Sequence, residues 1–365
     1  MMNDMVKSNS NYYPQDVSMG NLYKDTFPYF KIPKVNFNNS QVPMDLPEDI
    51  WITDTTFRDG QQSMPPYTTE QMVRIFDYLH DLDNNSGVIK QTEFFLYTEK
   101  DRKAAQTCIE RGYEFPEVTS WIRADKDDIK LVKEMDIKET GILMSCSDYH
   151  IFKKLNKTRE ETMDMYLSVV IEALNHGIRP RCHLEDITMA DFYGFVLPLV
   201  DKLMGFSKET DIPIKIRVCD TLGLGVSYNK ASLPRSVQGL IHGLRYYCNV
   251  PSEMIEWHGH NDFYAAVSNA TTAWLYGASA INTSLLGIGE RTGISPLEAM
   301  LIEYIQLTGT TKNLNLEVIT ELTEYFQREI DYHVPDKTPF VGSHFNITRE
   351  DINSKLYPDY ELPAI

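Results

Sequence analysis

The sequence predicts an α/β protein whose main part is a (β/α)8 TIM barrel. From about residue 50, short segments rich in β-branched and apolar residues alternate with longer stretches of helical periodicity, which is typical of βα units around a parallel sheet. About eight such units fill roughly 240 residues, which matches the size of a (β/α)8 barrel. The competing fold, a doubly wound open sheet, would be favoured by an early GxGxxG loop, and the sequence has none.

Eight segments are expected to form the strands, and amphipathic helices are expected between them. One helix is expected over 68–82 and another over 158–177, where Thr158 and Glu161 suit a capping box and Gly177 suits the stop after the last turn. The expected strands are WITDTTF (51–57), VIKQTEFFLY (88–97), PEVTSW (116–121), TGILMSC (140–146), IRPRCHLED (178–186), IKIRVCD (214–220), MIEWHGH (254–260) and AINTSLLG (280–287).

The two ends of the chain lack this rhythm. Residues 1–48 are rich in Asn, Pro, Tyr and Asp without clear periodicity, and we interpret them as an N-terminal arm that packs over another part of the molecule. The catalytic barrel is then expected over 49–310. After it, NLEVITELTEYFQREIDYHV has the pattern of one amphipathic helix, so 311–365 is expected to form a small C-terminal helical subdomain.

Composition excludes several classes of function. The formal net charge of -17 argues against nucleic acid as a partner, because a phosphate backbone requires a basic face. No apolar run reaches the length of a transmembrane helix, and the first residues lack the apolar centre of a signal peptide. The 5 cysteines form no CxxC pair, which favours buried thiols in a reducing cytosol. We therefore expect a soluble cytoplasmic protein with small-molecule substrates, no nucleic acid and no membrane.

Reactive side chains cluster where the expected strands end, which is where (β/α)8 barrels place their catalytic residues. In EWHGHNDF, His258 and His260 stand two positions apart on a strand, so both imidazoles project from one face. Together with a carboxylate from another strand end they could hold a divalent ion, and Asp59 in RDG is the candidate. Alone, the HxH pattern also fits two hydrogen-bonding residues at a strand end.

The fifth expected strand carries Arg181, His183 and Glu185 on one face, and that face should point into the barrel. Polar groups buried there need partners, so they form an internal network or line a site. Arg181 could hold a substrate carboxylate, and Glu185 could act as a general base. Glu93, on the second strand, has the same two interpretations.

The segment LGIGERTGISP follows the eighth expected strand. Its glycines allow a ligand to approach the backbone closely, and the loops after strands 7 and 8 of barrels often bind phosphate. We therefore expect Gly287, Gly289 and Arg291 to contact a cofactor. The alternative is that Glu290 and Arg291 only brace the loop with an ion pair.

Taken in order, DTTFRDGQQ, HGHND and GIGERTG resemble the aldol/Claisen-type DRE-TIM metallolyases, over about residues 50–310. The resemblance implies that Asp59, His258 and His260 bind a divalent metal and that Arg58 polarises the substrate carbonyl and the enolate. Manganese is the first expectation, with Mg, Co or Zn as alternatives. The resemblance also implies acetyl-CoA as co-substrate.

The same resemblance extends to the substrate pocket. RCHLED matches the pattern with which homocitrate synthases of the family line the 2-oxoacid and the acetyl group, through Arg181, Glu185 and Asp186. Asp220-Thr221 matches the DT of the sixth strand, which places Thr221 near the substrate carboxylate. The expected substrate-binding residues are therefore Gln62, Glu93, Arg181, His183 and Thr221.

The C-terminal part departs from the family pattern. Longer synthases carry FxHxxGIH and supply its histidine to a partner's site, whereas this chain has TPFVGSHFNITRED. His344 stands near that place and His333 is a second candidate, so the expected catalytic residues are Arg58, Glu185 and His344. Family behaviour also implies a homodimer, joined through the arm and the tail.

His183 bears on the choice of substrate, because homocitrate synthases have a small residue at that position. A bulkier residue would shorten the pocket and suit oxaloacetate better than 2-oxoglutarate. The expected reaction is therefore condensation of acetyl-CoA with oxaloacetate to citrate and CoA, as in the Re-face citrate synthases of the family. Three alternatives are a homocitrate, isopropylmalate or citramalate type of synthase, a hydroxyacyl-CoA lyase and a non-catalytic barrel. Lyases of the family usually have a cysteine in a Gly-rich loop near the eighth strand. No cysteine follows Cys248 in this chain, so the lyase is disfavoured.

Overall fold

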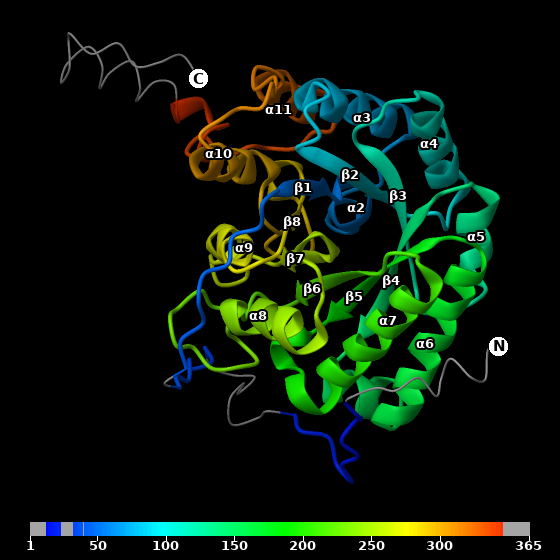
Figure 1. Cartoon of the computed structure of the whole chain (residues 1–365). Helices are drawn as coiled ribbons and strands as arrows, with labels where there is room; N and C mark the ends of the chain where they lie inside the picture. Colours follow the sequence, from blue (N-terminus) through cyan, green and yellow to red (C-terminus); the bar gives the residue numbers. More distant parts are fainter. Residues whose placement is uncertain (1–11, 23–31, 39, 346–365) are drawn as a thin grey trace.

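The computed structural model describes residues 12–22, 32–38 and 40–345 and contains a closed barrel of eight parallel strands in chain order (Figure 1). The first strand pairs with the eighth as well as with the second, which closes the sheet and excludes the doubly wound alternative. All eight expected strands are confirmed. They are β1 (Trp51–Asp54), β2 (Ile89–Phe94), β3 (Glu117–Ile122), β4 (Glu139–Ser145), β5 (Arg179–Glu185), β6 (Lys215–Asp220), β7 (Ile255–Gly259) and β8 (Ala280–Thr283).

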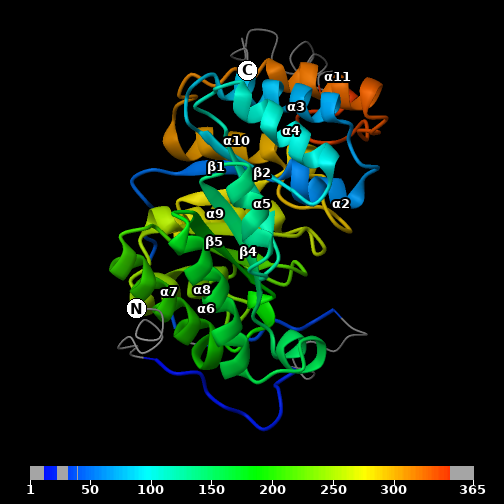
Figure 2. The ribbon, with the colours of Figure 1, turned by 90° about the vertical axis from the view of Figure 1, so that its right-hand side faces the viewer.

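Helices surround the sheet, as two views at right angles show (Figures 1 and 2). The expected capping box forms at Thr158, and Gly177 takes the positive φ that ends that helix. A second capping box, which was not expected, forms at Thr68. Within the described ranges, no helix has the length and apolar character needed to cross a bilayer. The helices are α2 (Gln61–Ser63), α3 (Thr69–Asp83), α4 (Glu99–Glu110), α5 (Asp128–Glu134), α6 (Arg159–Asn175), α7 (Leu197–Thr210), α8 (Val237–Cys248), α9 (Ala266–Leu275), α10 (Leu297–Thr308) and α11 (Val318–Glu329).

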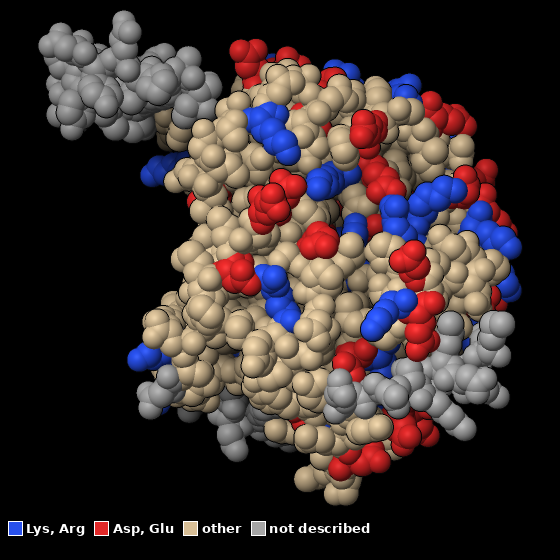
Figure 3. Space-filling model, in the orientation of Figure 1, with Lys and Arg blue, Asp and Glu red and all other residues tan. Residues whose placement is uncertain are grey.

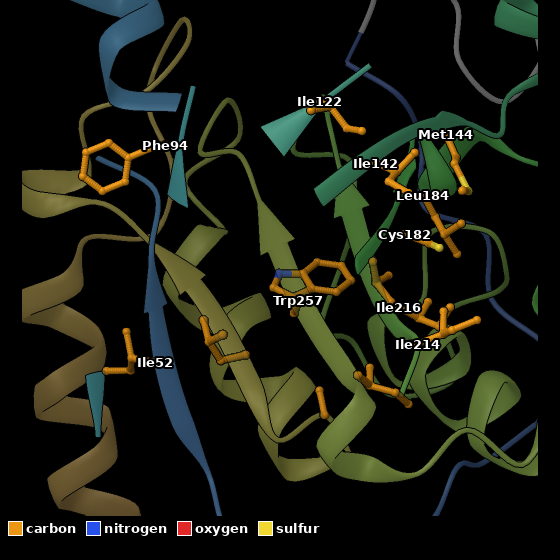
Figure 4. Packing of buried hydrophobic residues seen from close by; sticks show 14 of the residues in the cluster. Ile52, Phe94, Ile122, Ile142, Met144, Cys182, Leu184, Ile214, Ile216 and Trp257 are labelled. Atoms are coloured by element: carbon orange, nitrogen blue, oxygen red, sulfur yellow. The ribbon is translucent and has the colours of Figure 1, made fainter. Parts of the chain in front are cut away.

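The hydrophobic core lies between the outer face of the barrel and the helices. Side chains such as Ile52, Ile216 and Trp257 are fully buried and belong to one cluster with apolar residues of the helices (Figure 4). All 5 cysteines are buried and free, which confirms the expectation of buried thiols. Because successive strand residues point to opposite faces, this packing commits the alternate residues to the barrel interior.

The barrel interior is ionic rather than aliphatic. Arg181 Nη2 lies 2.6 Å from Glu93 Oε1, and Arg181 Nη1 lies 3.0 Å from Glu139 Oε1. Arg217 Nη1 lies 3.0 Å from Glu93 Oε2, and Arg217 Nε lies 2.6 Å from Glu256 Oε2. (β/α)8 barrels usually fill this space with branched aliphatic side chains. We call these five residues the interior ion network.

The interior ion network is charged despite its burial. Burial raises the pKa of a carboxyl, but Arg217 and Arg181 hold the pKa of Glu93 and of Glu256 below its ordinary value. Burial likewise opposes charge on Arg217, but Glu256 and Glu93 keep its pKa above its ordinary value. Glu93, Glu256 and Arg217 therefore favour their charged forms despite burial. Removing one partner would leave an uncompensated buried charge, which costs about 3–5 kcal/mol.

The described part of the N-terminal arm contacts the barrel's helices. Gln15 donates its backbone N–H to the Gly194 carbonyl and accepts from Arg159 at its own carbonyl, at 3.0 Å. Further along, Phe37 forms a β-bridge with Ala231. The arm thus follows the α6–α8 side of the molecule, where Figure 1 shows it in blue.

The C-terminal helix α11 packs against α3. Phe326 is fully buried there, with its ring centroid 6.3 Å from that of Tyr67. Gln71 Nε2 also donates to the Glu329 carbonyl at 2.8 Å. The amphipathic helix expected in this region is confirmed. These contacts join the helix to the barrel wall.

We predict that Phe326→Ala lowers the free energy of unfolding by about 3–5 kcal/mol, because it leaves a cavity between α11 and α3. Phe326→Leu is the matched control and should lose clearly less, since it keeps most of the buried volume. Chemical denaturation followed by circular dichroism would measure both. An unchanged midpoint for Phe326→Ala would mean that α11 does not unfold together with the barrel.

Candidate active site and metal centre

Asp59, His258 and His260 come together at the mouth of the barrel. One ligand atom from each lies within 4.8 Å of the others, and all three residues are buried. His258 Nε2 lies 3.3 Å from His260 Nε2, which in turn lies 3.9 Å from Asp59 Oδ2. The structure therefore brings together the three ligands that the sequence predicts.

Local structure explains how each ligand reaches this point. After β1 the chain makes a wide helical turn, Thr56–Gly60, in which the Thr55 carbonyl accepts the backbone N–H groups of Arg58, Asp59 and Gly60. This turn directs the Asp59 side chain to the barrel mouth. The two histidines stand at the end of β7, two positions apart, and so share the inner face of the strand.

The chemistry of the three side chains fits a divalent metal. Within the described residues, the buried Asp59 Oδ2 has no hydrogen-bond partner, as expected of an atom that serves as a ligand. Burial lowers the pKa of both His258 and His260, so both rings favour the neutral form that offers a lone pair. Two imidazoles and one carboxylate form the facial ligand set that leaves further coordination positions open to substrate.

A second set of residues orients His258. Its Nδ1 lies 2.8 Å from Asn282 Oδ1, and the Asn282 amide donates to Thr53 Oγ1 at 2.9 Å. Thr53 Oγ1 in turn hydrogen-bonds Glu256, a member of the interior ion network. The proton of His258 is thereby held on Nδ1, and Nε2 is left as the ligand atom. Asn282 was not among the expected residues, because an asparagine inside a strand carries no local signal of this role.

A cavity opens next to the three ligands. Seven of the residues singled out from the sequence line it: Arg58, Asp59, His183, Glu185, Thr221, His258 and His260. Its wall also contains Leu143, Arg217, Cys219 and Glu290, which the sequence analysis did not assign to the substrate pocket.

Arg58 is fixed on one side of this cavity. Its guanidinium lies 4.7 Å from the ring centroid of Trp121 and 5.9 Å from that of Phe95. Its Nη1 is 3.5 Å from Asp59 Oδ1. Aromatic faces attract cations, so the rings hold the guanidinium beside the ligand set.

Glu185 is held on another side. It accepts a hydrogen bond from the Ser145 hydroxyl and lies 3.8 Å from His150 Nε2. His150 Nδ1 is 2.7 Å from Asp186 Oδ2. The carboxylate therefore lies beside an imidazole that Asp186 orients. His150 was not among the expected residues, because it reaches Glu185 from the turn after β4.

His183 occupies its place because Gly141 has no side chain. A Cβ on Gly141 would lie 2.5 Å from His183 Nε2 and 3.0 Å from Glu93 Oε1. Burial lowers the pKa of His183 well below its ordinary value, an effect that Arg217 and Arg181 reinforce, so the ring is neutral. Its Nε2 has no hydrogen-bond partner among the residues described.

Several expected substrate contacts lie away from the cavity. Arg181 and Glu93 lie inside the barrel, bonded to each other and to the rest of the interior ion network. Gln62 is exposed on α2. His333 and His344 are exposed in the segment after α11, outside the cavity of their own chain.

The glycine-rich loop after β8 is braced by Arg291. Its guanidinium contacts both oxygens of Asp262, at 2.8 and 3.0 Å, and donates to the Thr221 carbonyl at 2.5 Å. Glu290 Oε2 is more distant from Arg291 Nη1, at 3.8 Å. Arg291 therefore braces the loop, as in the alternative interpretation of the sequence. Its main partner is Asp262 and not Glu290.

The glycines of this loop allow it to turn against the metal centre. A Cβ on Gly293 would lie 1.9 Å from the Gly287 carbonyl oxygen, and Gly293 has φ +81°. A Cβ on Gly289 would lie 2.9 Å from Asp59 Oδ2. Both positions therefore require glycine, one for the turn and the other for close approach to a metal ligand.

Comparison with known proteins gives a consistent result. The family model described as HMGL-like matches residues 49–325. The chain is 71% identical to the Citrate (Re)-synthase of Clostridium kluyveri over 350 residues, which are 96% of this chain and 77% of that protein. A Citrate (Re)-synthase of Syntrophus aciditrophicus is 51% identical over 340 residues, which cover 93% of this chain and 54% of that protein.

Solved structures agree on the fold. The hydroxymethylglutaryl-CoA lyase of Pseudomonas aeruginosa matches with a TM-score of 0.62 and 17% identity, over 79% of this chain and 95% of that chain. Identity this low bears on the fold alone.

We predict that Asn282→Ala weakens metal binding by about 10- to 100-fold, because His258 loses the partner that fixes its tautomer and orientation. Isothermal titration of metal-free protein with Mn²⁺ would measure the affinity. Asn261→Ala, at a position just outside the cavity, is the comparison, and His258→Ala should abolish tight binding. Equal affinities for wild type and Asn282→Ala would remove Asn282 from the metal centre.

Proposed function

Because this chain belongs to the HMGL-like family, we propose that it condenses acetyl-CoA with oxaloacetate to give citrate and CoA, the reaction named in its citrate (Re)-synthase relatives. The observation that carries this proposal is 71% identity to the Clostridium kluyveri protein across 96% of the chain. The chain is thus an acyltransferase that converts the acyl group into an alkyl group on transfer. A buried two-histidine, one-carboxylate set beside a guanidinium and a second carboxylate supplies suitable groups.

The cofactor that fits this donor set is a divalent metal, held by Asp59, His258 and His260. When bound, such a metal would polarise the ketone of oxaloacetate for attack. Nitrogen and oxygen ligands do not select one ion, and we propose manganese first, with magnesium, cobalt and zinc as alternatives.

Glu185 is the proposed general base. It takes a methyl proton from acetyl-CoA, and Ser145 and His150 keep the carboxylate in position while it does so. Arg58 donates hydrogen bonds to the oxygen of the resulting enolate, whose carbon attacks the ketone carbon of oxaloacetate. The C=O π bond breaks, and the oxygen takes up a proton to become the hydroxyl of citryl-CoA, which balances the proton removed by Glu185. Water then cleaves the thioester, which releases CoA and citrate.

The remaining assignments concern the edges of the site. The loop with Gly287, Gly289 and Arg291 is the proposed contact for acetyl-CoA, and Thr221, which lines the cavity, is proposed to contact oxaloacetate. His344 is exposed beyond its own cavity, so a catalytic role for it requires a homodimer in which it reaches the partner's site. Buried free thiols suit a cytoplasmic protein.

The surface agrees with small anionic substrates rather than a nucleic acid. Basic and acidic side chains alternate over the face in Figure 3, and no broad basic patch appears there. With a net charge of -17, the chain must concentrate positive charge locally to bind an anion.

We predict that purified protein with Mn²⁺ and acetyl-CoA releases CoA with oxaloacetate at least about tenfold faster, as kcat/KM, than with 2-oxoglutarate, 2-oxoisovalerate or pyruvate. Thiol titration measures CoA, and an enzymatic assay measures citrate. His260→Ala is the control without metal-dependent turnover. A preference for 2-oxoglutarate would instead assign the chain to the homocitrate type of synthase.

A second prediction concerns the base. Glu185→Gln keeps the shape of the side chain but removes its basicity, so kcat should fall by about 10²- to 10⁴-fold while Mn²⁺ affinity stays unchanged. Glu290→Gln also neutralises a carboxylate of the cavity wall and should lose much less. Comparable losses in the two variants would point to a general charge effect and not to a base at position 185.

A further inference from the structure

Arg217 is a buried guanidinium with one nitrogen unused. Its Nε and Nη1 are engaged by Glu256 and Glu93, while its buried Nη2 has no hydrogen-bond partner among the described residues. Leaving a buried charged donor unpaired is costly, so such an atom calls for a ligand. Arg217 also lines the cavity beside the metal centre.

His183 stands beside Arg217 with the same property. The two residues are direct partners in the pairing of β5 with β6, so their side chains leave adjacent strands at the same level of the barrel. His183 Nε2 is also buried without a partner in the described part of the chain, and it too lines the cavity. Glu93 contacts both, at 3.0 Å from Arg217 Nη1 and 3.5 Å from His183 Nε2.

The rest of the cavity wall leaves few other places for an anion. Glu185 and Glu290 repel a carboxylate, Cys219 and Leu143 offer no charge, and Thr221 offers only an uncharged hydroxyl, which is assigned to the carboxylate next to the ketone. Arg58 is held beside Asp59 and is assigned to the enolate. A carboxylate that enters away from the metal ligands therefore finds its donors at Arg217 and His183.

We propose that Arg217 and His183 together bind the distal carboxylate of the oxoacid and so select a four-carbon dicarboxylate. This inference rests on the proposed function, in which the ketone end of oxaloacetate faces Asp59, His258 and His260. One methylene separates that end from the distal carboxylate, so the depth of the cavity at His183 sets the length accepted. Glu93 is then a positioning residue that holds both donors from behind.

The test compares oxaloacetate with pyruvate, which differs by lacking the distal carboxylate. Binding of each to Mn²⁺-loaded protein is measured by calorimetry without acetyl-CoA, and kcat and KM are measured with acetyl-CoA. Arg217→Gln should weaken oxaloacetate binding by at least about 30-fold and pyruvate binding by less than about threefold. The KM for acetyl-CoA should not change, and Mn²⁺ titration reports whether the site is still folded.

Two further variants keep the test decisive if Arg217→Gln does not fold. The double variant Arg217→Gln with Glu256→Gln removes one charge of each sign from the interior ion network. It should show the same selective loss of oxaloacetate binding that is expected for Arg217→Gln. His183→Ser leaves the network intact and should raise the KM for oxaloacetate while increasing the use of 2-oxoglutarate by about tenfold or more. The result for the double variant tests the contribution of Arg217, and the result for His183→Ser tests that of His183.

Arg181→Gln is the rival position, because Arg181 belongs to the same network but does not line the cavity. Selective loss of oxaloacetate in Arg181→Gln, with none in Arg217→Gln, would overturn the proposal. So would wild type that binds oxaloacetate no better than pyruvate. Arg217-dependent binding of oxaloacetate without CoA release would uphold this inference and refute the proposed reaction instead.

Discussion

The ion network inside the barrel is the interaction on which the rest of the site depends. Glu93 and Glu256 each contact Arg217 and also reach toward the mouth, Glu93 to His183 and Glu256 through Thr53 toward the metal centre. Charges taken out of water must be paired, and in this interior each charged side chain contacts at least one of opposite sign. The ion pairs that offset the cost of burying these charges therefore also orient the side chains at the barrel mouth. A metal ligand and a wall of the cavity are held by one continuous set of hydrogen bonds.

The electrostatic character of the mouth follows from that arrangement. The imidazoles of His258 and His260 are neutral because burial disfavours their charged form, whereas the guanidinium of Arg217 stays charged because two carboxylates lie behind it. The site thus offers lone pairs on one side and fixed positive charge on the other. In a chain with a net charge of -17, this separation gives an anionic substrate a defined orientation.

The fold could be predicted from the sequence because its strands and helices produce regular local patterns of apolar and polar residues. Alternation along each strand and the repeated βα rhythm predicted all eight strands, and two histidines at i and i+2 predicted two of the three candidate metal ligands. What could not be predicted depends on depth and on contacts between strands. Arg181 and Arg217 are both inward-facing arginines of the ion network on neighbouring strands, and only the closed barrel shows that Arg217 also lines the cavity while Arg181 does not. Asn282 and His150 act through partners about 24 and 35 positions away, which no local pattern records.

The contact between Gly141 and His183 couples two strands in a way that has evolutionary consequences. The glycine on β4 leaves the space that the imidazole on β5 fills, and even a methyl group there would collide with the ring. A larger side chain at position 141 can therefore be accepted only after His183 has been replaced by a smaller residue. In the opposite order, the new side chain would collide with the imidazole and disrupt the site. If His183 sets the accepted substrate length as proposed, that length depends on both residues, and the effects of changing them should be strongly non-additive.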